Sequence, residues 1–182
     1  MKRLISIAAV ASFAALSLTA CSAGDSVVPN SHVTIAEVGE INTLNPDVLA
    51  STSSKIASDL SVLTAQRFYE VDKNGELVAN KNYGTVEVTK QSPFTLTYKF
   101  GKSAVWSDGS KLDATDLALA VTAAKVVQFN SVHFGSSLSE AKIVGTPNAG
   151  DTSLTLQFDQ PIADWKTILN VAVPAHIVGK SA

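Results

Sequence analysis

The residues that could perform chemistry in this chain stand at spacings that common catalytic motifs do not use. Gly101-Lys-Ser103 and Gly179-Lys-Ser181 look like the end of a phosphate-binding loop, which needs another glycine five residues before its second glycine. Leu96 and Pro174 occupy those two positions. The chain also has no Gly-x-Ser-x-Gly sequence, the turn that presents a nucleophilic serine. We therefore predict that the chain is not an enzyme and takes no nucleotide cofactor.

The residue types that commonly bind metals are also not grouped at metal-binding spacings. The three histidines, His32, His133 and His176, lie far apart, and a single cysteine cannot build a zinc site or a disulfide. Asp72-Lys-Asn-Gly-Glu76 has the look of a calcium loop but lacks the later glutamate at the required spacing. We interpret this segment as a hairpin turn and predict no metal site.

Asp113 and Asp116 form the one close pair of carboxylates that precedes an apolar helical stripe. A pair at this spacing could serve general acid–base chemistry. It could also cap a helix, since a carboxylate there accepts free backbone N–H groups and complements the helix dipole. The stripe that follows, Leu117, Ala120, Val121 and Ala124, favours capping.

Composition limits the class of protein. The chain has 182 residues, of which 46% are hydrophobic and 16% are charged, so it is expected to fold. Its length suits one domain, or one domain with a targeting segment, and is too short for two ordinary lobes. The net charge of −2 gives no basic patch for nucleic acid.

The N-terminus is typical of an exported protein. Lys2 and Arg3 precede an uncharged apolar run, residues 4–20, and the sequence Leu18-Thr-Ala-Cys21 resembles the lipobox of bacterial lipoproteins. In a lipobox the cysteine is acylated and becomes the mature N-terminus. The alternative is an incidental Cys21 behind a transmembrane anchor, for which the run is short. We expect a signal peptide at 1–20, a flexible tether at 21–31 and a folded domain at 32–182.

The folded part alternates predicted strands and helices. Apolar periodicity predicts strands at 33–35, 94–100 and 154–158, a hairpin of 68–71 with 76–79, and helices over 51–67, after Asp113, and over 161–169. Residues 39–46 read as a turn-rich loop. Trp165 lies on the apolar face of the last predicted helix and is expected in the core.

Four motifs along this part resemble the family 5 solute-binding proteins of ABC transporters. The first two are residues 68–80, with Tyr69 and the Asn-Gly-Glu-Leu-Val stretch, and residues 94–117, with Ala104-Val-Trp-Ser-Asp-Gly109. The others are Leu44-Asn-Pro46 and Pro174-Ala-His-Ile177. They occur in the family's order, behind the lipobox that such receptors commonly carry. Val71 departs from the glycine that often follows at that place, and residues 128–152 match little.

The resemblance implies an α/β fold, the mixed-sheet N-terminal lobe of a type II, two-lobed periplasmic-binding-protein fold. Family members are much longer, so the second lobe is expected to be missing here. Peptide ligands of the family lie extended in the cleft between the lobes and are read through main-chain hydrogen bonds.

The resemblance also implies candidate ligand-binding residues. The loop after the first strand faces the cleft in the family, which points to Gly39, Glu40, Ile41 and Asn42; an ordinary solvated loop is the alternative. Trp106 lies within the signature, where core packing is commoner than ligand stacking.

The function implied is the lipid-anchored substrate-binding component of an ABC importer for peptides or similar solutes. Its partners would be an oligopeptide or similar small solute, the permease subunits, and the cell membrane through Cys21 at the extracytoplasmic face. The alternative is a degenerate single-lobe fragment that no longer binds solute and acts at most as a structural or interaction module. An enzyme is the third and least supported hypothesis.

Overall fold

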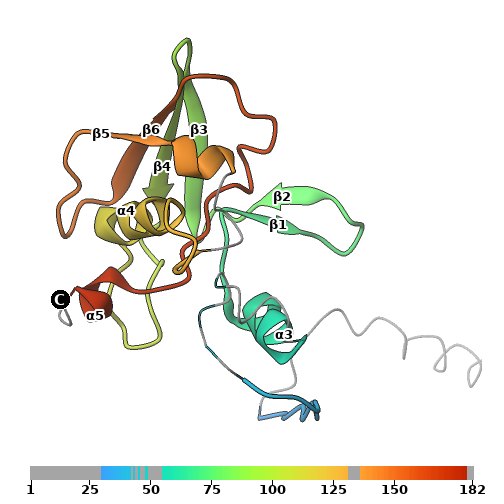
Figure 1. Ribbon diagram of the computed structural model, residues 1–182. Coiled ribbons are helices and arrows are strands. Elements are labelled where there is room, and N and C mark those ends of the chain that lie inside the picture. The colour runs from blue at the N-terminus through green and yellow to red at the C-terminus, as the bar shows by residue number, and fades with distance from the viewer. Residues whose placement is uncertain are drawn as a thin grey trace, which may run out of the picture. The chain divides into compact units, whose positions relative to one another are not determined.

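The computed structural model describes residues 30–41, 43, 45, 48, 55–130 and 136–179 (Figure 1). The chain divides into two units, Met1–Ala36 and Glu37–Ala182. In the first unit the described residues, 30–36, form neither helix nor strand. The predicted strand at 33–35 is therefore wrong: Val33 and Ile35 are 86% and 66% exposed and pair with no described strand, so nothing holds them in a ladder.

A four-stranded sheet forms the centre of the second unit. Its strands are β3 (Gly84–Gln91), β4 (Phe94–Phe100), β5 (Lys142–Val144) and β6 (Ser153–Phe158). The order is β3-β4-β6-β5, and each neighbouring pair is antiparallel, with Leu96 opposite Leu156. The alternation predicted for β4 and β6 is confirmed, because the apolar residues of both strands are buried. The short strand β5 and the 3₁₀ helix Ser137–Glu140 before it were not predicted.

Helix α4 (Ala114–Ala123) packs against β6 and closes the core (Figure 1). Leu117 and Val121 are fully buried, as the apolar stripe predicts. In the same core, Phe68 lies among the rings of Tyr83, Tyr98 and Phe100 with centroid distances of 4.9, 5.3 and 5.6 Å. Aromatic packing of this kind anchors the chain where it enters the sheet.

The segment before the sheet contains a helix and a hairpin. Helix α3 (Lys55–Thr64) lies within the predicted 51–67, whose first four residues are outside the described part of the chain. It ends at Thr64, since the chain then leaves the helical path to bring Phe68 into the core. Strands β1 (Tyr69–Val71) and β2 (Leu77–Ala79) form the predicted hairpin, with Gly75 at a positive φ of 84° in its turn.

The helix predicted over 161–169 is wrong. This segment consists of turns, such as the one closed by the Thr167 N–H on the Asp164 carbonyl at 2.9 Å. Its apolar residues still contact the core: Ile168 and Leu169 are buried, and Trp165 packs against the core while half-exposed. The two buried residues, Ile168 and Leu169, are neighbours in the sequence and would point in different directions on a helix. An irregular path therefore buries both of them better than a helix would. The chain continues to the short helix α5 (Ala175–Val178).

Candidate functional site

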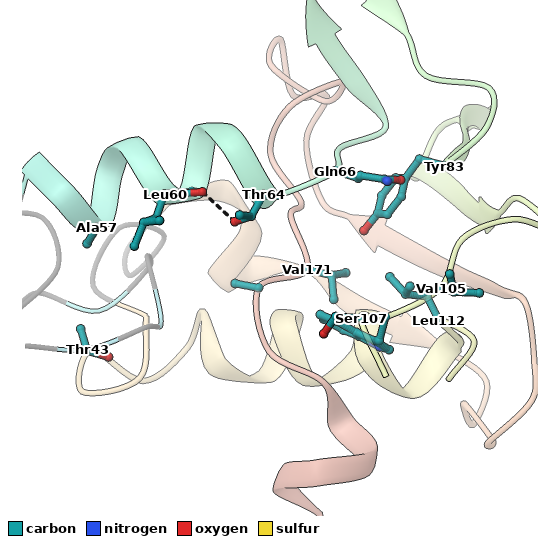
Figure 2. Close-up of a pocket in the computed structure, with 14 residues that line it drawn as sticks. Thr43, Ala57, Leu60, Thr64, Gln66, Tyr83, Val105, Ser107, Leu112 and Val171 are labelled. Atoms are coloured by element: carbon teal, nitrogen blue, oxygen red, sulfur yellow. Dashed lines mark hydrogen bonds between the residues drawn. The ribbon is translucent and has the colours of Figure 1, made fainter. Parts of the chain in front are cut away.

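A cavity of about 480 Å³ lies between helix α3 and the segments that surround the start of α4 (Figure 2). One side is formed by α3 through Ala57, Leu60 and Thr64, and the other by residues 105–107, Leu112 and residues 171–172. Figure 2 shows the Tyr83 side chain at one end of the cavity and Thr43 at the other. None of the 14 lining residues carries a formal charge.

Trp106 is the largest side chain that lines this cavity. Its indole Nε1–H donates a hydrogen bond to Asp116 Oδ2 at 3.2 Å, and its ring lies 6.5 Å from that of His176. The side chain is half-buried and packs against the core. The two alternatives that the sequence left open for Trp106, core packing and a place at a ligand site, are therefore compatible in the structure.

Asp116, the partner of Trp106, is buried at the start of α4 and only 2% exposed. Its Oδ2 also accepts the Asp113 N–H at 3.0 Å, while its Oδ1 accepts the Ala175 N–H at 2.7 Å. Asp113 in turn accepts the N–H groups of Thr115 and Gly150, each at 2.8 Å. The capping prediction for this pair is confirmed, because the two aspartates form a capping box.

Tyr83 was not singled out from the sequence, where it appears only as a tyrosine next to the glycine that starts β3. It is 3% exposed, and its hydroxyl points into the cavity (Figure 2). Burial raises the pKa of Tyr83, and the negative charge of Asp116 raises it further. The hydroxyl is therefore protonated at neutral pH and can both donate and accept a hydrogen bond.

The other predicted ligand-binding residues that the structure describes do not line this cavity. Gly39, Glu40 and Ile41 are exposed and do not line it, whereas Thr43, one residue beyond the predicted set, does. Asn42 and the predicted lipid acceptor Cys21 lie outside the described residues. A role for these residues in binding or anchoring stays a prediction.

A second hollow of about 720 Å³ lies between α3, the β1–β2 hairpin and residues 166–170. It is larger but differs in chemistry, since Arg67, Glu70 and Lys166 line it. Lys166 Nζ lies 5.2 Å from the centre of the Tyr69 ring, a cation–π contact. The first cavity, of about 480 Å³, is called the Trp106 cavity below. It is the stronger candidate for a solute site, because Trp106 is one of the ligand-binding residues predicted from the sequence motifs.

The described residues contain no group of three or more His, Cys, Asp or Glu side chains that could hold a metal ion. Among those same residues, every helix is too short or too polar to cross a bilayer.

Comparisons with known proteins agree on one group. No protein-family model matches the chain. An uncharacterized lipoprotein of Mycobacterium tuberculosis is 27% identical over 169 residues, which cover 91% of this chain and 29% of that protein. The oligopeptide-binding protein OppA of the same species is 28% identical over 104 residues, or 57% of this chain and 18% of OppA. The chain thus spans less than a third of the length of these relatives.

A comparison of the fold with solved structures points to the same group of proteins. The oligopeptide-binding protein AppA from Bacillus subtilis, solved with a nonapeptide, superposes with a TM-score of 0.60 at 14% identity. The match covers 80% of this chain and 28% of AppA. The described residues thus have an α/β fold similar to part of such binding proteins. All pairings between their described strands are antiparallel, whereas a mixed sheet was expected. In sequence and in fold, the chain thus resembles part of the oligopeptide-binding proteins of ABC transporters, the group to which its motifs point.

Proposed function

We propose that the chain acts as the lipid-anchored substrate-binding component, or part of it, of an ABC importer for peptides or similar solutes. The observation that carries the proposal is the uncharged cavity at Trp106 in a chain similar to oligopeptide-binding proteins. Cys21 would hold the chain at the extracytoplasmic face of the cell membrane. The permease subunits of the importer would be its protein partners.

The chemistry of the cavity suits the uncharged parts of a peptide. Its apolar lining accepts an apolar side chain, and a charged group would lose its hydration there without finding an opposite charge. Trp106 offers an aromatic ring for stacking, and the protonated Tyr83 hydroxyl offers a hydrogen bond to a main-chain amide or carbonyl. Gly39, Glu40, Ile41 and Asn42 remain candidates for contact with the solute outside the cavity lining.

A second role remains in competition, that of an interaction module without solute binding. Exposed apolar side chains around the hairpin favour it: Val62, Leu63 and Val71 are 74%, 67% and 70% exposed. All three line the second hollow, and large exposed apolar patches are typical of protein-binding faces. The two roles differ in whether a small peptide binds at the cavity.

Calorimetric titration of the full chain with a mixed oligopeptide pool tests the proposal. We expect binding no tighter than about 1 mM, or about −4 kcal/mol, because the lining residues all belong to one lobe and cannot enclose a ligand as typical sites do. Trp106→Ala should weaken binding further, whereas Trp165→Ala, which removes a tryptophan outside the cavity, should leave it unchanged. Equal losses in the two variants would contradict the proposal.

A further inference from the structure

The Asp116 carboxylate joins three segments that are far apart in the sequence. Its hydrogen-bond donors are Trp106 in the loop before α4, Asp113 at the start of α4, and Ala175 at the start of α5. The last of these contacts spans 59 residues. A helix cap needs only the contact with Asp113, so the other two contacts serve something else.

Both additional contacts reach walls of the Trp106 cavity. Trp106 itself lines the cavity, and the segment that ends at Ala175 contributes Val171 and Ala172 to the same side of its lining. A second link joins the same two segments, since His176 Nε2 lies 2.9 Å from Asp108 Oδ2. The position of the indole relative to residues 171–172 is thus determined through α4 and α5 rather than by the loop alone.

Because Asp116 is buried, its carboxylate depends on these three hydrogen-bond donors. At 2% exposure, water cannot replace a lost partner of the carboxylate at low cost. Hydrogen bonds to an ionised acceptor are also the stronger ones. An amide in place of the carboxylate would keep the shape, but its NH₂ group would face an N–H donor on one side.

We propose that Asp116 is a positioning residue for the solute-binding cavity: it holds the Trp106 indole in the cavity wall and fixes the neighbouring 171–175 segment against it. This inference rests on the proposed function for its link to solute, and on the three hydrogen bonds for the positioning itself. Asp113 caps the same helix without touching Trp106 or Ala175, so it provides a matched control.

Hydrogen exchange of the Trp106 indole N–H, followed by NMR in the full chain, tests the positioning. The chain has two tryptophans, so Trp165→Phe leaves one indole signal and assigns it. In Asp116→Asn we expect exchange at least about tenfold faster, the factor that about 1.4 kcal/mol represents. In Asp113→Ala it should stay within about twofold of the wild type, although the melting temperature falls.

Exchange that rises in both variants in proportion to their loss of melting temperature would overturn the proposal, because Asp116 would then act only on stability. If Asp116→Asn does not fold, Trp106→Phe addresses the same junction from the other side. Loss of the indole donor should free the carboxylate and speed exchange of the Ala175 amide by several-fold. An unchanged Ala175 amide would equally overturn the proposal.

Titration with tetra-alanine separates this inference from the proposed function. If the Trp106 signal of the wild type moves with peptide, Asp116→Asn should need a several-fold higher peptide concentration for the same movement. An identical response would contradict positioning for solute. If tetra-alanine moves no signal of the wild-type cavity, the proposed function fails there, while the exchange rates still decide whether Asp116 positions Trp106.

Discussion

Two aspartates of the capping box differ in what they hold. Asp113 accepts N–H groups from Thr115 and Gly150 and so ties the start of α4 to the loop before β6. Burial alone would raise the pKa of Asp113, but the Thr115 hydroxyl, followed by the N–H groups of Gly150 and Thr115, holds this pKa below its ordinary value. Asp116 instead faces inward, toward Trp106 and Ala175. The spacing of the pair predicted the cap, whereas nothing in the sequence marked the contact with residue 175.

The ion pair of Asp108 with His176 gives a prediction at the residue scale. The backbone N–H of Ser110 and then the His176 ring lower the pKa of Asp108 to about 2. Because this pKa lies below the ordinary value of about 3.9, the carboxylate stabilises the fold fully above pH 4, and that contribution is lost as the pH falls toward 2. We expect an NMR titration of the Asp108 carboxyl group with a midpoint near 2.

The variant His176→Gln checks the cause of this shift. The Asp108 midpoint should rise only part of the way toward the ordinary value, because the larger contribution comes from Ser110. A midpoint near the ordinary value in the wild-type protein would show that the Asp108 contacts do not persist in solution.

At the scale of elements, the sequence predicted those that rest on local signals. The alternation of β4 and β6, the Asp-x-Asn-Gly turn between β1 and β2, and the cap of α4 each depend on residues close together in the chain. The errors at 33–35 and 161–169 concern segments whose conformation depends on distant partners. Val33 and Ile35 are strand-forming residue types, but no described strand lies next to them. Ile168 and Leu169 are buried although their segment forms no helix.

The candidate site shows the same limit. The motif that contains Trp106 could be recognised in the sequence, and the structure places this residue in a cavity. Tyr83, Leu60 and Val171 line the same cavity although they come from a turn, a helix and an irregular segment that are far apart in the sequence. Their proximity follows from the packing of α3 against the rest of the unit, which local periodicity does not specify.

The end of the β3–β4 pair where Gly84 lies opposite Phe100 provides a prediction at the scale of elements. A Cβ atom at Gly84 would lie 2.3 Å from the Lys99 carbonyl oxygen and 2.7 Å from the Phe68 ring. Gly84→Ala should therefore separate the strands locally and lower the free energy of unfolding by about 1–3 kcal/mol, as overpacking does. Chemical denaturation measures the loss, with the neighbouring exposed Thr85→Ala as a control expected to change stability by less than about 0.5 kcal/mol. A Gly84→Ala protein as stable as this control would contradict the strand register.

At the scale of the whole molecule, the packing is uneven along the chain. Among the described residues, ten of the sixteen large hydrophobic side chains that remain exposed lie between Val33 and Val78. The sheet and α4, by contrast, contribute only Val144 to these sixteen exposed side chains. The chain spans 29% of the M. tuberculosis lipoprotein that it resembles. The exposed apolar side chains of the segment before the sheet are the natural place to test for a protein partner.

Membrane attachment gives a prediction for the whole chain. Cys21 should be acylated, so that the protein fractionates with membranes. Each buried CH₂ of an acyl chain contributes about 0.8 kcal/mol to that attachment. Cys21→Ser should release the protein or leave its signal peptide uncleaved, as shown by fractionation and mass spectrometry. A Cys21→Ser protein that stays on the membrane after signal cleavage would show that the lipoprotein interpretation is wrong.

The most direct test of the central claim, that the Trp106 cavity receives a peptide-type solute, is an NMR titration of the full chain with oligopeptides. The account predicts that the signals of Trp106, Tyr83 and Leu60 shift together and approach saturation at millimolar peptide, while those of Val144 on β5 stay in place. Shifts confined to other surfaces, or no shifts at all at millimolar peptide, would contradict the cavity as a solute site. Saturation at micromolar peptide would contradict the argument that a cavity on one lobe binds weakly.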